Sequence, residues 1–446
     1  MVKVYSLIIG ICLEDFCLDI FLIYVIVIDK GIYIYIMDDR IYWKDPLKNK
    51  CAKREEGKYI TFEYDIGGWN NIRMALEIVF IFAYITGRTI VLPPSMHLYL
   101  LDKDTKQHSL MDFYDEKLFT NNIIRIISLQ EYLQELPNTI SKPSPVILER
   151  LEQEPLFNYW GHGVPSLFLW MREVGYHWRF DDKTFFTFMD DQVSQSFGGD
   201  QDKWWAAKDK WTKRFLPYRT LLQRGTHIMY ILGGRMMDAP VWHFKGDGSE
   251  RLIAHFTSKL YIECDKMNLY VRRFVRDSLR YHDSIFNIAW KMIDKLNRFG
   301  GGGGGWCSAH IRRGDFQFVD TRLSCKELLE VFKGEISVGK IIYIATDEPD
   351  KSFFNLLREY YTIYFWDDII DMGIENSNWI GMIEQIIASH GEIFYGTYLS
   401  TFTHYIIRMR GYLKKEKNRY IRGEMMEEKS ICSWEHEYKD TWENLD

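Results

Sequence analysis

The sequence of 446 residues lacks the cysteine patterns that hold metal ions or disulfide frameworks. Its seven cysteines are widely spaced, and no two of them form a CxxC pair. A structural zinc site needs such closely spaced ligands, so we predict no metal site. The odd number of cysteines does not establish a disulfide framework either, and the redox compartment stays open on this observation.

An excess of basic residues is also missing. The chain has 56 Lys and Arg against 62 Asp and Glu, which gives a net charge of -6. A general nucleic-acid binder needs a basic face to neutralise phosphates, so we predict no nucleic-acid partner, although a local basic pocket fits this total. Apolar residues make up 47% of the chain, which is enough for a large core and for two domains.

No long uninterrupted apolar run is present. The segment 4–28 is mostly apolar, but Glu14, Asp15 and Asp19 interrupt it, and the clean run that follows covers only 20–28. That is well short of the ~20 residues that span a bilayer. Two interpretations stay open: a signal-anchor-like segment that attaches the protein to a membrane, and a pair of buried strands. The absence of any Asn-x-Ser/Thr sequence does not decide about secretion.

The first well-formed unit is a strand, a helix and a strand. Residues 59–64 alternate as a strand does, Gly67 and Gly68 form a turn, and residues 89–92 predict the next strand. Between them, apolar residues recur with helical spacing at Ile72, Ala75, Leu76, Val79, Phe80 and Ala83. Gly87 is placed where a helix ends. Such a unit predicts a parallel sheet.

The middle of the chain is less regular. Residues 100–250 are rich in aromatics, which we interpret as core residues more readily than as a sugar-binding platform. Residues 252–296 predict helix, and six glycines at 300–305 predict a flexible connector.

Strands and helices alternate again after the glycines. The predicted strands are 307–311, 340–345, 362–366 and 392–397. The predicted helices are 351–361 with Asp350 as cap, 378–391 ending at Gly391, and one opened by Ser400. We therefore predict an α/β protein with an N-terminal segment at 1–56 and Rossmann-like domains at 57–250 and 251–446.

Ligands of parallel sheets bind at the carboxyl ends of the strands, where this chain has three polar clusters. The first is the turn with Gly68, Asn70 and Asn71, where the backbone can approach a ligand and amides can bind it. An ordinary strand–helix turn is the alternative.

The second cluster, at residues 310–315, reads His-Ile-Arg-Arg-Gly-Asp. Strand alternation places His310 and Arg312 on one face and Arg313 on the other. A guanidinium binds pyrophosphate well, and Asp315 can orient it. A salt-bridged strand end is the alternative. An Arg-Gly-Asp adhesion loop is a weak reading of three residues, and a phosphate loop would need the GxxxxGK[ST] pattern, which is absent.

The third cluster combines Asp347, just after a strand, with Ser400, Thr401 and Thr403 at the start of a helix. The carboxylate suits ribose hydroxyls or a base, and the helix start suits an anion, although simple helix capping is the alternative. Together the three clusters predict a pocket for a nucleoside diphosphate in which Arg312 takes the place of a metal ion. The one DxD sequence, at 200–202, follows no apolar strand and reads as a solvated loop.

These motifs resemble the GDP-fucose-dependent O-fucosyltransferase family. That family has a GG-x-N turn, an H-x-R-x-x-D stretch, an A-T-D strand end and a G-T-x-x-S-T-F segment. Over roughly 340 residues this chain has the same four in the same order, at 67–70, 310–315, 345–347 and 396–402.

The resemblance implies a GT-B fold, with the nucleotide sugar held mainly by the C-terminal domain. It implies inverting, metal-independent transfer of fucose from GDP-fucose, which is a substrate, with no cofactor. Arg312 would be the catalytic residue that binds the β-phosphate, supported by His310 and Asp315. The remaining implied roles are nucleoside binding for Asp347, phosphate and base binding for Ser400, Thr401 and Phe402, and a contact from the N-terminal domain for Asn70.

One position departs from the family pattern. Some relatives have a glutamate as general base where this chain has Gly67. Asp65 and Glu63 are nearby candidates, and a mechanism without a dedicated base is the other possibility.

The resemblance leaves three hypotheses about function. The first is a fucosyltransferase that modifies Ser or Thr of a protein in the lumen of the endoplasmic reticulum or Golgi. The second is a GT-B enzyme with a glycan acceptor or another nucleotide sugar. The third is a catalytically silent protein that only binds a nucleotide sugar. Such a protein has less need of a cation at the leaving group, so the presence of Arg312 favours an enzyme.

Overall fold

The computed structural model describes strands within residues 3–36 and the chain at 54–143, 165–177, 239–246 and 265–421. Short gaps within these ranges fall at 66, 96–97, 99–100, 102–107, 116, 121–122, 139, 301–304, 317, 371–373, 375 and 399.

Five parallel strands form the N-terminal sheet in the order β6-β5-β4-β8-β7. The strands are β4 (Tyr59–Phe62), β5 (Thr89–Leu92), β6 (Ile126–Ser128), β7 (Tyr176–His177) and β8 (Val241–Phe244). The predicted strand–helix–strand unit is confirmed, because β4 and β5 pair in parallel around α1 (Trp69–Thr86). Gly87 ends α1 in the left-handed conformation, with φ 70°, which glycine adopts without strain.

Three shorter helices and a 3-10 turn complete the N-terminal half. They are η2 (Leu110–Asp112), α2 (Lys117–Thr120), α3 (Leu129–Glu135) and α5 (Pro165–Val174). On α5, Trp170 is buried and its indole N–H donates to the Ser141 carbonyl at 3.1 Å. This aromatic is thus a core residue, as predicted, whereas the tryptophans at 204–211 lie outside the described residues.

A second sheet of five parallel strands forms the C-terminal half in the order β11-β10-β9-β12-β13. The strands are β9 (Cys307–Ile311), β10 (Ile341–Thr346), β11 (Thr362–Tyr364), β12 (Phe394–Thr397) and β13 (Asn418–Ile421). Counted along this half of the chain, the order is 3-2-1-4-5, that of a doubly wound sheet. The order reverses between β9 and β12, which is where such sheets bind ligands.

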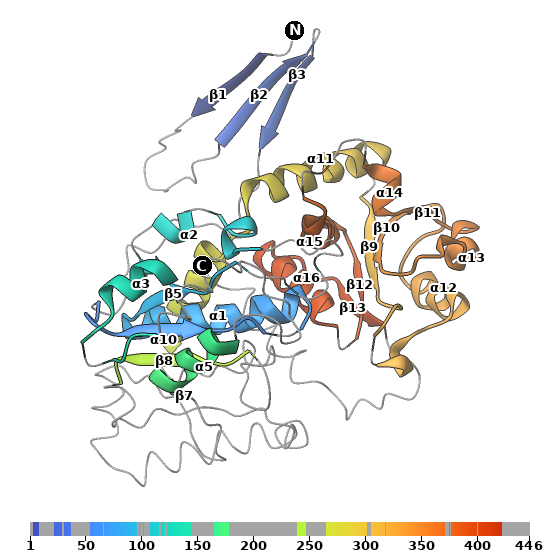
Figure 1. Cartoon of the computed structure of the whole chain (residues 1–446). Coiled ribbons are helices and arrows are strands. Elements are labelled where there is room, and N and C mark those ends of the chain that lie inside the picture. Colours follow the sequence, from blue (N-terminus) through green and yellow to red (C-terminus); the bar gives the residue numbers. More distant parts are fainter. Residues whose placement is uncertain are drawn as a thin grey trace.

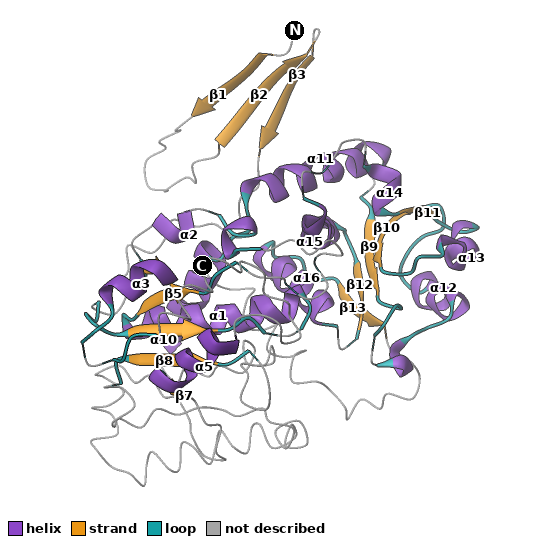
Figure 2. Ribbon diagram, in the orientation of Figure 1, coloured by secondary structure: helices purple, strands orange, loops and turns teal. Residues whose placement is uncertain are grey.

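Helices cover both faces of this sheet (Figure 2). The α-helices are α12 (Cys325–Lys333), α13 (Asn355–Arg358), α14 (Trp366–Ile369), α15 (Ile380–His390) and α16 (Thr401–Tyr412). The 3-10 turns are η5 (Val319–Thr321), η6 (Lys351–Phe354) and η7 (Ser377–Trp379). Along β10, Tyr343 faces the core shared with α15, and Ile342 and Ile344 face a second core below α12 and α13.

Two helical predictions need correction. The helix expected at 252–296 is two helices, α10 (Asp265–Ser278) and α11 (Asp283–Phe299), and 252–264 lies outside the described residues. The break follows from two contacts: Tyr281 forms a bridge with Tyr114, and His282 Nδ1 caps α11 by accepting from the amide of Ser284 at 3.2 Å.

The helix expected at 351–361 is shorter than predicted. Asp350 caps it as expected, accepting from the amide of Ser352 at 2.9 Å, but the segment forms the 3-10 turn η6 followed by α13, which ends at Arg358.

The two halves pack directly on each other through α1 and α16 (Figure 1). Helix α10 packs on α1, with the rings of Tyr84 and Phe274 stacked at 4.4 Å, while α11 packs on α15. The predicted domain boundary at residue 250 lies outside the described residues and stays a prediction, as does the flexible connector at 301–304. The fold class is confirmed: two parallel sheets with helices, in the arrangement of the GT-B class.

The N-terminal strands β1 (Lys3–Ile8), β2 (Leu22–Ile28) and β3 (Gly31–Ile36) form an antiparallel sheet. Within 4–28 the described residues therefore lie in strands. In the part of the chain that the structure describes, no helix is long and apolar enough to cross a membrane.

Candidate functional site

The end of β9 is held in place by a threonine from the strand on each side. Thr346 of β10 donates to the carbonyl of Ile311 at 2.6 Å. Thr397 of β12 donates to the carbonyl of His310 at 3.1 Å and accepts from the amide of Arg312 at 2.9 Å. These bonds fix the backbone where the chain leaves the sheet, so the side chain of Arg312 starts from a defined position.

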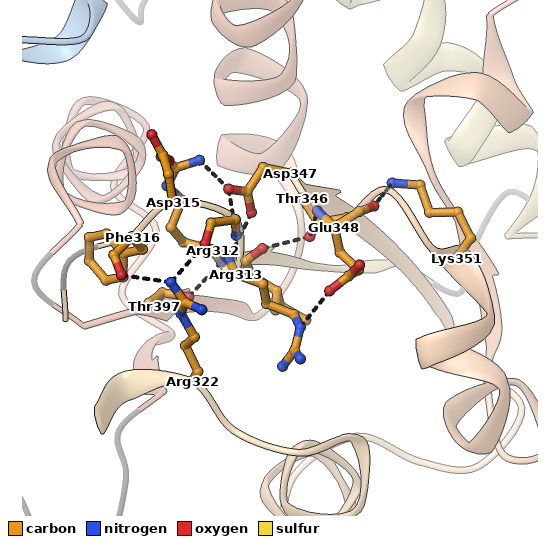
Figure 3. Close-up of polar contacts among 12 residues, drawn as sticks. Arg312, Arg313, Asp315, Phe316, Arg322, Thr346, Asp347, Glu348, Lys351 and Thr397 are labelled. Atoms are coloured by element: carbon orange, nitrogen blue, oxygen red, sulfur yellow. Dashed lines mark hydrogen bonds and ion pairs between the residues drawn. The ribbon is translucent and has the colours of Figure 1, made fainter. Parts of the chain in front are cut away.

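Arg312 lies between two carboxylates (Figure 3). Its guanidinium pairs with Asp347 through one nitrogen and with Asp315 through the other, and the side chain is 26% exposed. The two carboxylates are not equivalent. Asp347 also accepts from the amides of Arg313 at 2.7 Å and Gly314 at 2.9 Å, whereas Asp315 is 62% exposed. Asp347 is therefore part of the local framework, and Asp315 is an accessible partner.

Gly314 is required for this arrangement. A Cβ at this position would lie 2.4 Å from Asp347 Oδ2. Arg322 closes the loop from the other side by donating to the carbonyls of Gly314 at 2.7 Å and Phe316 at 2.8 Å (Figure 3). The charged turn is thus a bonded structure, and not a slack strand end.

Arg313 has a structural environment. It donates through Nε to Glu348 at 2.8 Å and through Nη1 to the carbonyl of Leu323 at 2.8 Å. Its guanidinium also lies 3.7 Å from the centre of the Phe353 ring. The prediction that the two adjacent arginines face different surroundings is confirmed by these contacts.

His310 is buried beside the start of α16. Its Nδ1 lies 2.8 Å from Thr403 Oγ1, and its ring stacks on Phe402 with centroids 4.4 Å apart. Burial, and secondarily the charge of Arg312, lowers the pKa of His310 to about 3. The imidazole is therefore neutral at physiological pH and acts as a packing and hydrogen-bonding group.

The N-terminus of α16 has no side-chain cap. Ser400 occupies the N-cap position but makes no capping hydrogen bond, and Thr403 is engaged with His310. By contrast, Ser128 and Ser324 cap α3 and α12 with complete capping boxes. The structure therefore does not support the interpretation of Ser400 as a simple helix cap. The backbone amides of the first turn of α16, which includes Thr401, stay available to an anion.

The N-terminus of α1 also lacks a side-chain cap, with Gly68 at the N-cap position. The backbone N–H of Asn71 donates to the Gly68 carbonyl at 2.8 Å. Asn70 accepts through Oδ1 from Gln385 Nε2 at 2.9 Å, and the same nitrogen lies 3.5 Å from the Phe402 carbonyl oxygen. Asn70 of the N-terminal half is thereby brought beside the start of α16.

A side chain at position 67 would clash with Asn71. A Cβ at Gly67 would lie 2.4 Å from Asn71 Nδ2 and 2.6 Å from Asn71 Cβ. A glutamate at this position, as in some relatives, would require the turn at Gly67 or the side chain of Asn71 to shift.

The two candidate bases near Gly67 differ in their contacts. Glu63 accepts from Nε and Nη2 of Arg172, each at 2.7 Å, and pairs with His243 Nε2 at 2.9 Å. Burial raises the pKa of Glu63, but these hydrogen bonds outweigh burial and bring the pKa to about 2. Asp65 is buried and accepts the amide of Gly67 at 2.9 Å.

The structure therefore brings most predicted site residues to the carboxyl ends of β9, β10 and β12. Arg312, Asp315 and Asp347 form one cluster, and His310 joins Phe402 and the start of α16. Within the described residues, no group of three or more His, Cys, Asp or Glu could hold a metal ion. The structure leaves the role of each residue a prediction.

Several residues of this site were not predicted from the sequence. Thr346 and Thr397 belong to the A-T-D and G-T motifs, so their motif positions were the available signal. Gln385 is a polar residue among the mostly apolar buried residues of α15, and this was its only signal.

Comparisons with known proteins place this chain in a family. Residues 59–413 match the model of the GDP-fucose protein O-fucosyltransferase family. A search among curated protein sequences finds no match.

Solved structures of fucosyltransferases are similar to this chain at low identity. A POFUT1 structure in complex with GDP has 14% identity and a TM-score of 0.41, and covers 82% of this chain and 99% of its own. The NodZ fucosyltransferase from Bradyrhizobium has 12% identity and a TM-score of 0.38, with 80% and 93% covered. For Arabidopsis thaliana FUT1 the values are 12% and 0.36, with 81% and 70% covered.

Membership of the family is decided by the family model and not by these structural similarities. The matched region includes all four motifs and both parallel sheets up to β12. The chain belongs to the GDP-fucose protein O-fucosyltransferase family.

Proposed function

We propose that this glycosyltransferase transfers fucose from GDP-fucose to a hydroxyl acceptor, with inversion at the anomeric carbon and without a metal ion. The observation that carries the proposal is the position of Arg312. Its partly exposed guanidinium lies at the carboxyl end of β9, the strand next to the order reversal, and its backbone amide bonds to Thr397 of β12, the strand that leads to the uncapped start of α16. Both features favour a diphosphate at this place.

In this proposal Arg312 binds the β-phosphate and stabilises the negative charge that develops on departing GDP. Ser400, Thr401 and Phe402 hold phosphate and base. The partners of Arg312 support its role, because Asp347 is fixed by two backbone amides and orients one side of the guanidinium. Binding of the nucleoside by Asp347 stays part of the proposal.

The contacts of Glu63 argue against this residue as the general base. A carboxylate with a pKa near 2, paired with Arg172, accepts a proton poorly at neutral pH. We therefore favour Asp65 or a mechanism with no dedicated base. If Asp65 is the base, Asp65→Asn lowers kcat while binding of GDP is retained; unchanged kcat excludes it.

For the acceptor we propose Ser or Thr of a protein, in the lumen of the endoplasmic reticulum or Golgi. The support is family membership, since the family model describes protein O-fucosyltransferases. A glycan acceptor would leave the donor site unchanged. Transfer assays with folded protein acceptors and with oligosaccharides, scored by the mass of one added fucose, separate the two.

The test of the donor assignment is release of GDP from GDP-fucose by the purified protein. Arg312→Ala should reduce turnover about 100- to 1,000-fold, because it removes a group that stabilises the leaving charge. EDTA should leave turnover nearly unchanged. Binding without turnover in both proteins would favour a silent binding protein. Thermal stabilisation by UDP or ADP sugars, with none by GDP-fucose, would contradict the donor.

A further inference from the structure

Gln385 is a buried carboxamide at the place where the two halves of the molecule meet. It lies on α15 and is 0% exposed. Its Nε2 donates to Asn70 Oδ1 at 2.9 Å and lies 3.5 Å from the carbonyl oxygen of Phe402. Its Oε1 accepts from the hydroxyl of Tyr281 at 3.4 Å. One side chain thus contacts α1, α16 and the segment before α11.

The neighbours of Gln385 fix which end of its amide faces which partner. The carbonyl oxygen of Phe402 can only accept, so the group that faces it is the nitrogen. On the other side, the indole N–H of Trp69 can only donate, and it donates to the hydroxyl oxygen of Tyr281 at 3.2 Å. The Tyr281 hydroxyl directs its own proton to Gln385 Oε1. The Phe402 carbonyl on one side and the Trp69–Tyr281 pair on the other therefore require the same orientation of the Gln385 side-chain amide.

The orientation extends to Asn70. Because Gln385 presents its NH2 group, the side-chain oxygen of Asn70 must accept from it. The NH2 group of Asn70 therefore points away from Gln385. Asn70 is only half-buried, and its oxygen faces a fully buried partner. The nitrogen of Asn70 makes no hydrogen bond with any residue that the structure describes.

We infer that Gln385 is a positioning residue, which locks the amide of Asn70 with its NH2 group toward the site at the start of α16. There the NH2 group is a fixed hydrogen-bond donor for an oxygen of the phosphate or sugar of the substrate. This role rests on the proposed function. A donor that is held in place before the substrate binds saves the entropy of orienting it, which strengthens binding and catalysis.

The test is Gln385→Glu, which keeps the shape of the side chain and removes its hydrogen-bond donor. The assays are run at high pH, where the introduced group is an ionised carboxylate that can only accept, so the amide of Asn70 turns its NH2 group inward and the site loses a donor. We expect kcat/KM for GDP-fucose to fall about 10- to 100-fold. In an Asn70→Ala background the same change should have little further effect. Fully additive losses would overturn the inference.

A second measurement uses the ligand-free protein and does not depend on turnover. In the wild type, the side-chain NH2 protons of Asn70 should exchange quickly with water by NMR, and in Gln385→Glu they should be protected. Protection in the wild type, or the same exchange in both proteins, would overturn the inference. If the wild type does not use GDP-fucose, the proposed function fails, and this measurement still decides the role of Gln385.

Ser389→Ala is the matched control on the same helix. Ser389 is buried, and its hydroxyl donates to the carbonyl of Ile386 at 2.7 Å, away from Asn70. We expect kcat/KM and the exchange of the Asn70 protons to stay within about twofold of the wild type. Changes as large as those in Gln385→Glu would show that any weakening of α15 has this effect, and would overturn the specific role.

Discussion

At the scale of single residues, the two carboxylates that pair with Arg312 have different roles. Asp347 accepts two backbone amides besides the guanidinium, and this holds the turn after β9 together. Asp315 contacts Arg312 from an exposed position. An exposed ion pair stabilises little, whereas an amide that loses its acceptor inside a bonded turn is costly.

This difference predicts unequal effects of two equivalent substitutions. Asp347→Asn offers one oxygen where the carboxylate offered two, so an amide of the turn loses its acceptor. Release of GDP should fall about 10- to 100-fold. Asp315→Asn removes only an exposed pair and should change the rate about fivefold at most. Steady-state kinetics on both variants measure this, and equal losses would show that Asp347 is not the orienting partner.

A second prediction at this scale concerns pH. The pKa of His310 is about 3 in the folded protein, against an ordinary value of 6.5, so only the unfolded chain takes up this proton between those values. Stability must therefore fall as the pH drops from 6.5 toward 3, by up to about 1.4 kcal/mol per pH unit from this group. Urea unfolding over this range should show a shallower fall for His310→Gln. Parallel curves for the two proteins would rule out the histidine as the cause.

At the scale of elements, the site depends on how closely α16 approaches β12. Gly396 allows this approach, because a Cβ there would lie 2.2 Å from Thr403 Cγ2 and 2.9 Å from Phe394 Cε1. Thr403 in turn holds His310. The glycine of the G-T motif is therefore a packing requirement of the strand–helix pair.

Gly396→Ala should push α16 away from β12 and disturb the bond between Thr403 and His310. We expect a loss of about 1–3 kcal/mol in the free energy of unfolding, measured in urea. Gly334→Ala is the control, because its Cβ would meet only the Val331 carbonyl oxygen at an ordinary 3.6 Å. That control should change stability by less than about 0.5 kcal/mol. If both variants were equally stable, the close approach would not matter.

At the scale of the whole molecule, a buried charge cluster joins the two halves. Glu77 of α1 pairs with Arg73 of the same helix and accepts from Arg408 Nη1 of α16 at 2.7 and 2.9 Å. The guanidinium of Arg73 lies 3.6 Å from the centre of the Tyr405 ring of α16. All three charged side chains are buried, so the pairing of α1 with α16 depends on the carboxylate.

Glu77→Gln should remove the negative charge that two buried guanidinium groups pair with. We expect a loss of about 3–5 kcal/mol in the free energy of unfolding. The control is Glu335→Gln, which breaks the exposed pair with Arg419 and should cost about 1 kcal/mol or less. Calorimetry compares the two variants, and a small effect at Glu77 would mean that other contacts hold the halves together.

Much of the fold was predictable from local patterns. The helix α1 and its end at Gly87 follow from one apolar stripe and one glycine, and β9 coincides with the predicted 307–311. The break between α10 and α11 was not predictable, because the residues around Tyr281 have a helical pattern. A bridge to Tyr114, far away in the chain, decides the break there.

The candidate site was predictable only in part. The motifs placed Arg312, Asp347 and Ser400 at strand and helix ends, and the structure has them there. The partners of these residues come from other parts of the chain, and no local pattern specifies such contacts. The pairing of Glu63 with Arg172 and His243 is one example, and it lowers the pKa of a residue that the sequence had suggested as a base.

The sequence by itself determined the strand–helix–strand unit around α1, most strands of the C-terminal sheet and the turns that bear the motifs, because hydrophobic periodicity and glycine positions act over a few residues. Only the tertiary structure decided which carboxylate fixes Arg312, why position 67 is glycine, and how Gln385 orients Asn70. The last of these depends on the contact between Asn70 and Gln385, 315 residues apart in the chain, which forms only when α1, α15 and α16 pack together.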